Sequence, residues 1–120
     1  MNVTVEIDTR EQNPLTFPDH IVWTPQEGRR GIVRIKTVRT KLDAGDYRLA
    51  EAPDCCVVER KGSLDELCTN LLSKDRVRFM AAWQRFVECC RYPVLLVEDT
   101  PHRAWTPQMK NVVASDALSS

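Results

Sequence analysis

Apolar and polar residues alternate at the start of the chain, where Val3, Val5 and Ile7 are separated by polar residues. Because the side chains of a strand point alternately to its two faces, this pattern predicts a strand with one apolar face, ending near Asp8. Similar short runs predict three more strands. They cover residues 32–38, 42–49 and 56–61, and the last two are expected to pair as an antiparallel hairpin.

A stretch without proline or glycine, residues 63–91, carries apolar residues at helical spacing. The periodicity lapses at residues 73–75, so we expect two helices with a break between them. Ser63 and Glu66 have the spacing of a capping box, which opens a helix by accepting hydrogen bonds from backbone N–H groups. The mainly apolar run of residues 94–98 then predicts a strand covered on both faces.

Two segments have the composition of connecting regions. Residues 10–31 contain three prolines and two glycines, so we expect an irregular loop that Phe17, Ile21 and Trp23 attach to the core. Residues 99–120 are expected to form a short C-terminal tail with a short helix over residues 109–114. The length of 120 residues corresponds to a single domain spanning residues 1–120.

The composition is that of a soluble globular protein, with 42% hydrophobic and 28% charged residues. No apolar run approaches the roughly 20 residues that span a bilayer, and the N-terminus lacks the pattern of a signal peptide. We therefore expect an intracellular protein without membrane contact, nuclear if the source is eukaryotic. Five cysteines, mostly in adjacent pairs, indicate reduced thiols because neither a disulfide framework nor a zinc spacing is present.

The formal net charge is zero, but the basic residues are unevenly distributed. Residues 29–41 contain six lysines and arginines and no acid. Such a run can follow a phosphate backbone. It is equally typical of the solvated outer face of a strand, since charged and apolar residues alternate within it.

The run Glu59-Arg60-Lys61 gives the sequence its strongest chemical signal. In a strand, Glu59 and Lys61 share one face and Arg60 points to the other. A carboxylate can bind a hard divalent cation, and a neighbouring ammonium group can orient water or stabilise a developing anion. By itself, however, the pair also fits a solvated strand face, and Asp46 after Gly45 also fits an ordinary turn.

Three short motifs in the right order change this balance: Asp8-Thr9-Arg10-Glu11, then Gly45-Asp46, then Glu59-Arg60-Lys61 followed after three residues by Asp65. With these motifs the sequence resembles the XPF-type structure-specific endonucleases, a branch of the PD-(D/E)xK nuclease superfamily. The resemblance covers roughly residues 3–98. It implies an α/β fold of the restriction-endonuclease type, with a small mixed sheet flanked by helices.

The resemblance also implies an activity, the metal-dependent hydrolysis of DNA phosphodiester bonds. Asp46 and Glu59 would bind Mg²⁺ or Mn²⁺, Asp8 would be a further ligand, directly or through water, and Lys61 would orient the attacking water or stabilise the phosphate. The residues expected to surround this group or contact phosphate are Arg10, Glu11, Arg60 and Asp65. Those expected to bind DNA elsewhere are Arg34, Lys36, Arg39 and Arg76.

Members of this family act on branched or junction DNA in repair or recombination, and most carry a helix-hairpin-helix module that binds DNA. The resemblance is to a short form without that module, so we expect a homodimer or a partner protein to supply further DNA contacts. The main alternative is a catalytically inactive nuclease-fold module that binds DNA or a protein. A soluble domain without any nucleic-acid role would require all three motifs to be coincidental.

Overall fold

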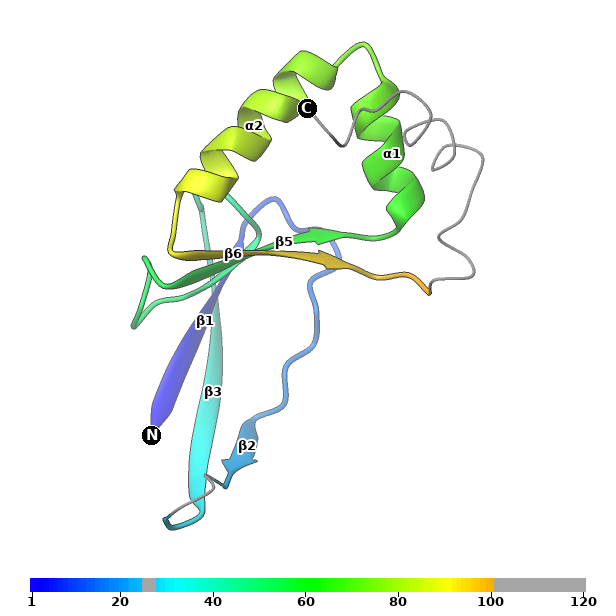
Figure 1. Ribbon diagram of the computed structural model, residues 1–120. Coiled ribbons are helices and arrows are strands. Elements are labelled where there is room, and N and C mark those ends of the chain that lie inside the picture. The colour runs from blue at the N-terminus through cyan, green and yellow to red at the C-terminus, as the bar shows by residue number, and fades with distance from the viewer. Residues whose placement is uncertain (25–27, 101–120) are drawn as a thin grey trace.

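The computed structural model describes residues 1–24 and 28–100, and its elements form one six-stranded mixed sheet with two helices (Figure 1). The strands are β1 (Asn2–Asp8), β2 (His20–Trp23), β3 (Gly31–Thr40), β4 (Tyr47–Leu49), β5 (Cys56–Lys61) and β6 (Tyr92–Val97). The helices, α1 (Leu64–Leu72) and α2 (Arg76–Glu88), connect β5 to β6. The predicted α/β fold with a small mixed sheet and flanking helices is therefore confirmed.

The order of the strands in the sheet is β2-β3-β1-β4-β5-β6. The pairs β1–β3 and β5–β6 are parallel, and the other neighbours are antiparallel. Both helices lie on the same side of β5 and β6, while β1, β3 and β2 extend away from them (Figure 1). The end of β1, the start of β4 and the second half of β5 lie together beside α2.

Hydrophobic residues are buried in two clusters. One lies on the sheet, where Val5, Ile7 and Tyr47 are buried and residues of the loop after β1, Leu15 and Phe17, pack against them. The other lies under the helices, where Cys68 and Leu71 of α1 are buried with help from Phe79 and Met80 of α2.

The segment predicted as an irregular loop, residues 10–31, contains the short strand β2. This strand pairs antiparallel with β3 at the outer end of the sheet, through backbone hydrogen bonds that need no buried side chain. Ile21 is 47% exposed and Trp23 is 58% exposed, so the prediction that they attach the loop to the core is wrong. Of the three residues predicted to do so, Phe17 packs on the core, with its ring centroid 5.9 Å from that of Tyr47, and Leu15 packs on the same cluster.

The strand β6 was predicted to be covered on both faces, but it is the last strand of the sheet and one of its faces is open. Val94 and Leu96 are 41% and 38% exposed, because the helices cover only the opposite face of β6. Leu42, predicted to belong to the third strand, lies outside β4 in the preceding turn and is nonetheless 1% exposed.

The start of α1 and the break between the helices are as predicted. The Ser63 hydroxyl accepts a hydrogen bond from the Glu66 N–H at 3.0 Å, whereas the Glu66 carboxylate accepts from Gly62 at 2.9 Å and not from Ser63. The break falls at residues 73–75. The predicted helix at residues 109–114 lies outside the described residues. Within residues 1–24 and 28–100, neither helix is long and apolar enough to cross a bilayer.

Candidate active site

The hairpin formed by β4 and β5 brings two acidic side chains of the sequence motifs together. Tyr47 pairs with Val58, so the preceding Asp46 lies beside Glu59. The Asp46 N–H donates to the Val58 carbonyl at 2.8 Å, which fixes this register. Gly45 allows the approach, because its φ is +76° and a side chain there would come within 2.2 Å of Val57.

Asp46 and Glu59 lie opposite each other across the hairpin, and each side chain affects the ionisation of the other. Burial and repulsion from Asp46 raise the pKa of Glu59 to about 7, although Lys61 opposes the shift. Burial also raises the pKa of Asp46, against the hydrogen bond from the Arg60 backbone. Two acids held together in this way have a high affinity for a proton or for a cation that can replace it.

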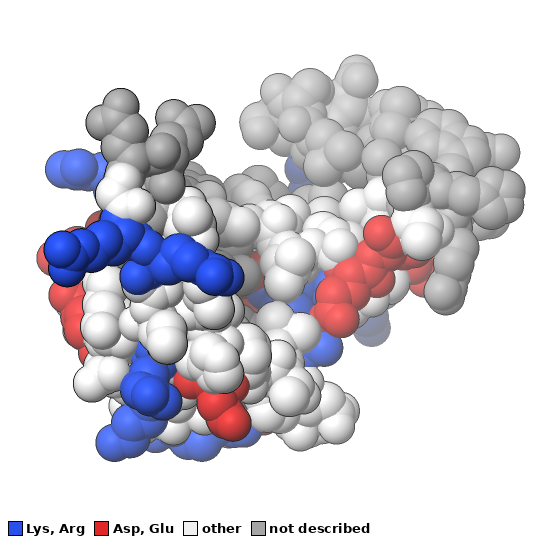
Figure 2. All heavy atoms as spheres, turned by 90° about the horizontal axis from the view of Figure 1, so that it is seen from below, with Lys and Arg blue, Asp and Glu red and all other residues white. Residues whose placement is uncertain are grey.

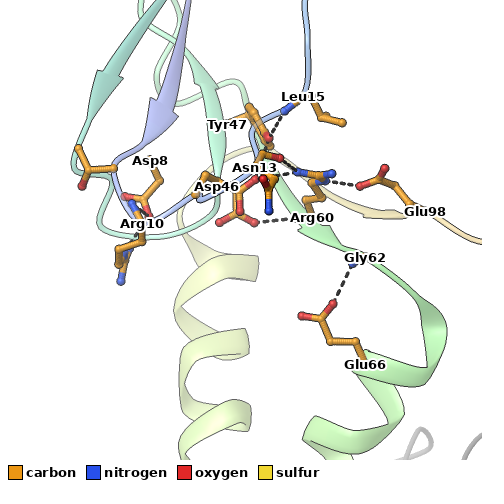
Figure 3. Close-up of polar contacts among 12 residues, drawn as sticks. Asp8, Arg10, Asn13, Leu15, Asp46, Tyr47, Arg60, Gly62, Glu66 and Glu98 are labelled. Carbon is orange, nitrogen blue, oxygen red and sulfur yellow. Dashed lines mark hydrogen bonds and ion pairs between the residues drawn. The ribbon is translucent and has the colours of Figure 1, made fainter.

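The backbone around this pair holds the Asp46 carboxylate in position. Its Oδ2 atom accepts a hydrogen bond from the backbone N–H of Arg60 at 2.8 Å, across the hairpin (Figure 3). The Asp46 carbonyl accepts from the N–H of Asp8 at 2.9 Å, which ties the end of β1 to the same corner. The first motif is thereby placed beside the other two.

Asp8 lies at this corner but is occupied by partners of its own. Its side chain accepts hydrogen bonds from the Leu42 N–H at 2.9 Å and from Arg10 Nε at 2.7 Å, and the residue is 1% exposed. Burial works to raise the pKa of Asp8, but the hydrogen bonds from Arg10 and Leu42 outweigh it and hold the pKa below its ordinary value. The structure therefore gives Asp8 a stabilising role at the end of β1.

We expect Asp8→Asn to destabilise the fold by about 1–3 kcal/mol, because the charge that pairs with Arg10 and accepts from Leu42 would be lost at a buried position. Urea unfolding at pH 7 measures the change. The depressed pKa of Asp8 adds a pH signature. The stabilisation is present above the pKa of the unfolded chain and is lost as the pH falls through the folded pKa, so the two proteins should converge in acid. A variant as stable as the wild type at pH 7 would contradict this role.

A pocket of about 320 Å³ opens beside the acidic pair, between the sheet and α2. The sheet side contributes four motif acids, Asp8, Glu11, Asp46 and Glu59, and α2 contributes Ala82, Arg85 and Phe86. The sequence had not marked Arg85 as a functional residue. In the sequence, Arg85 is distinguished only by its position next to Phe86, the buried residue of α2. Which side of α2 faces the acids is seen only in the tertiary structure.

Lys61 shares the face of Glu59, as the strand period predicted, but it lines a smaller neighbouring pocket of about 110 Å³ with Glu59, Phe79 and Trp83. Its Nζ atom donates to Asn70 Oδ1 at 3.3 Å and lies 5.3 Å from the centre of the Phe79 ring. Lys61 does not line the larger pocket beside Asp46. Glu59 borders both pockets and so connects the two groups.

The remaining motif residues are divided between the two faces of the sheet. Arg10 and Glu11 line the larger pocket. Arg60 points to the opposite face, as predicted, and contacts Asn13 and Glu98 there (Figure 3). Asp65 lies in the first turn of α1, outside both pockets, and one of its buried oxygens has no hydrogen-bond partner among the described residues.

The family comparison agrees with this geometry: the model of the ERCC4 domain matches residues 7–120. The chain belongs to the ERCC4 domain family. This is a nuclease family, so the resemblance to XPF-type nucleases that the motifs carried is confirmed at the level of the family. No curated protein and no solved structure is significantly similar to the chain.

The donor atoms of this ERCC4 domain suit a hard divalent cation. Within the described residues, no group of three or more His, Cys, Asp or Glu side chains is arranged to hold a metal ion. Asp46 and Glu59 offer carboxylate oxygens at the edge of a pocket large enough for water molecules and a substrate phosphate. Mg²⁺ commonly binds through one or two carboxylates together with water and substrate phosphates, so the residues present fit this ion.

The basic side chains of the ERCC4 domain are spread over several surfaces. Arg34 and Lys36 lie on one face of β3, and Figure 2 shows lysines and arginines gathered at the β2–β3 end. Arg34 is beside Asn2, six residues or about 20 Å along the strand from the Asp8 end. Arg39 points to the other face and donates to the carbonyls of Thr9 and Glu11, and Arg76 begins α2.

Proposed function

We propose that this ERCC4 domain is a metal-dependent endonuclease that hydrolyses phosphodiester bonds of DNA. The observation that carries the proposal is the pairing of Asp46 with Glu59 at the edge of a pocket also lined by Arg10 and Arg85. Acids suit a divalent cation, and exposed arginines suit the phosphates of the substrate. Hydrolysis of a phosphodiester bond by this mechanism needs the acids and the arginines close together.

In this proposal Asp46 and Glu59 bind Mg²⁺ or Mn²⁺. Asp8 contributes through a water molecule, because its oxygens already accept from Arg10 and Leu42. When bound, the ion supplies Lewis acidity toward the attacking water and positive charge toward the scissile phosphate. Lys61 lies on the same face and orients the attacking water or stabilises the charged phosphate.

The arginines of the site position the DNA. Arg10 has a side chain that is 67% exposed beside the pocket. Its Nε atom donates to Asp8 and its Nη2 atom donates to the Leu42 carbonyl at 3.0 Å, which leaves the remaining N–H groups for phosphate. Arg85 contacts phosphate from the opposite wall, and Arg76 does so from the start of α2. The substrate class proposed is branched or junction DNA in repair or recombination, with a homodimer or a partner protein adding further contacts.

A cleavage assay tests the proposal. Duplex, flap, fork and single-stranded DNA are each incubated with the protein and Mg²⁺, Mn²⁺ or EDTA. We expect cleavage that needs the metal and is strongest on a branched substrate. Binding of all substrates without cleavage in either metal would instead support the inactive DNA-binding module, and neither binding nor cleavage would exclude both.

The basic face of β3 gives a separate prediction about binding. If Arg34 and Lys36 contact phosphates, the double alanine variant should lower the salt dependence of DNA affinity by about 0.9 in log–log slope for each lost contact. Sequence preference should not change, because phosphate contacts carry no sequence information. Fluorescence anisotropy at several salt concentrations, with Ca²⁺ in place of Mg²⁺, measures the slope.

The control for this prediction is Lys74→Ala, which removes an exposed base from the turn between the helices. It should leave the slope unchanged. Arg39 is left intact because its side chain supports the loop after β1 through two carbonyl groups. An unchanged slope in the Arg34 and Lys36 variant would assign these residues to the solvated outer face of the strand.

A further inference from the structure

Each acid of the proposed metal site is followed in the chain by a residue that points to the reverse face of the sheet. Tyr47 follows Asp46 on β4, and Arg60 follows Glu59 on β5. Because neighbouring residues of a strand face opposite ways, whatever fixes Tyr47 and Arg60 on the reverse face also fixes the two acids on the front face.

Tyr47 and Arg60 meet at one carboxylate, that of Glu11, which lies after β1 and also borders the larger pocket. The Tyr47 hydroxyl donates to Glu11 Oε2 at 2.8 Å, and Arg60 Nη1 donates to the same oxygen at 3.2 Å. The Tyr47 oxygen also accepts from the Leu15 N–H at 2.9 Å. Arg60 continues to the Asn13 carbonyl and to Glu98 just after β6 (Figure 3). We refer to Glu11, Tyr47, Arg60 and Glu98 as the reverse-face network.

Apart from Glu98, whose side chain is 39% exposed, the network is largely shielded from solvent. Tyr47 is 4% exposed, and the side chains of Arg60 and Glu11 are 20% and 19% exposed. Hydrogen bonds to charged partners in such surroundings are stronger than those at an open surface.

The backbone of Arg60 connects the reverse-face network to the proposed metal site. The N–H of Arg60 donates to Asp46 Oδ2 at 2.8 Å, so the residue that anchors the network also holds the carboxylate. The hairpin itself is short: β4 and β5 pair through two residue pairs, and the Asp46 N–H adds one hydrogen bond to the Val58 carbonyl.

We propose that Tyr47 is a positioning residue, which acts through the reverse-face network to hold Asp46 and Glu59 at the spacing needed to bind a divalent cation. The inference rests on the proposed function, since it assigns the network a purpose only if the two acids bind metal. It differs from a role in fold stability alone. If Tyr47 only stabilised the fold, its replacement would lower the melting temperature of the protein and leave its affinity for metal unchanged.

The chain provides a matched test because it has two tyrosines. Tyr47→Phe removes the hydroxyl and keeps the ring that packs on Phe17. Tyr92→Phe makes the same chemical change on β6, at a residue that is 58% exposed and outside the network. Neither substitution changes the charge near the metal site, so a change in affinity cannot arise from a lost carboxylate.

Binding of Mn²⁺ to each protein is measured without DNA, from the electron paramagnetic resonance signal of the free ion, and melting temperatures are measured in EDTA. We expect Tyr47→Phe to weaken Mn²⁺ binding by about tenfold, at the lower end of the range for groups that orient metal ligands. Tyr92→Phe should bind as the wild type does. The melting temperature of Tyr47→Phe in EDTA should show that the protein remains folded.

Two results would overturn the inference, and they can be told apart. If the wild type binds Mn²⁺ and Tyr47→Phe binds it equally well, the network serves stability alone, and the proposed nuclease function is unaffected. If the wild type binds no Mn²⁺, the metal site itself is absent, and the proposed function fails together with the role of Tyr47.

Discussion

Asp46→Asn and Glu59→Gln are each expected to abolish cleavage of DNA while leaving its binding nearly intact. Both substitutions keep the size of the side chain and remove the negative charge that attracts a divalent cation. The contacts proposed to hold DNA are made by arginines and lysines, which these substitutions leave in place. Loss of metal binding should therefore lower the cleavage rate by several orders of magnitude, whereas the dissociation constant for DNA in Ca²⁺-free buffer should change little.

A control variant separates loss of the ligand from a general loss of charge in the pocket. Asp43 is an exposed acid that lines the same pocket as Asp46, but it belongs to none of the three motifs. Asp43→Asn should retain cleavage. Rates are measured under single-turnover conditions, and binding by fluorescence anisotropy. Normal cleavage by a clean preparation of either motif variant would remove the proposed mechanism.

The sequence predicted the site to the extent that local rules determine it. The period of two placed Glu59 and Lys61 on one face, and the turn before β5 placed Asp46 next to Glu59 through an antiparallel hairpin. The helix start at Ser63 followed from its capping pattern. These features depend on residues near each other in the chain, so the sequence pattern is sufficient for them.

Features that depend on distant contacts were not predictable in the same way. The position of Arg85 depends on how α2 packs over the sheet, and the hydrogen bond from Leu42 to Asp8 joins residues 34 positions apart. Likewise, β2 forms by pairing with β3, and its apolar residues stay exposed. It therefore lacks the alternation of buried and exposed positions by which a strand is predicted from sequence. The three motifs come together at one corner only when the sheet has formed.

The second large effect is expected in stability, and it needs no substrate. In the metal-free protein, Glu59 has a pKa of about 7 instead of its ordinary value of 4.5, because burial and the charge of Asp46 disfavour its ionised form. A carboxyl group whose pKa is raised by folding stabilises the folded state below its unfolded pKa, and this contribution is lost as the pH rises to the folded value. The wild type in EDTA should therefore melt at a lower temperature at pH 8 than at pH 5, as far as this pair is concerned.

Asp46→Asn should reduce this penalty, although the burial of Glu59, its largest cause, remains. The amide removes one of the two repelling charges, and its oxygen can still accept the hydrogen bond from the Arg60 N–H. In EDTA at pH 8 we expect the variant to be more stable than the wild type by about 1 kcal/mol or less. Its dependence on pH between 5 and 8 should be weaker, because Glu59 no longer ionises against a neighbouring charge.

A divalent cation should favour the wild type over Asp46→Asn in thermal stability. A ligand that binds only the folded state stabilises it by mass action, so millimolar Mg²⁺ or Mn²⁺ should raise the melting temperature of the wild type. Asp46→Asn has lost one of the two carboxylates and should show little of this gain. Thermal melts of both proteins in EDTA and in metal, at pH 5 and pH 8, measure all of these differences. A wild type that ignores the metal, together with a destabilised Asp46→Asn, would mean that the two acids share no metal site and that Asp46 is an ordinary turn residue.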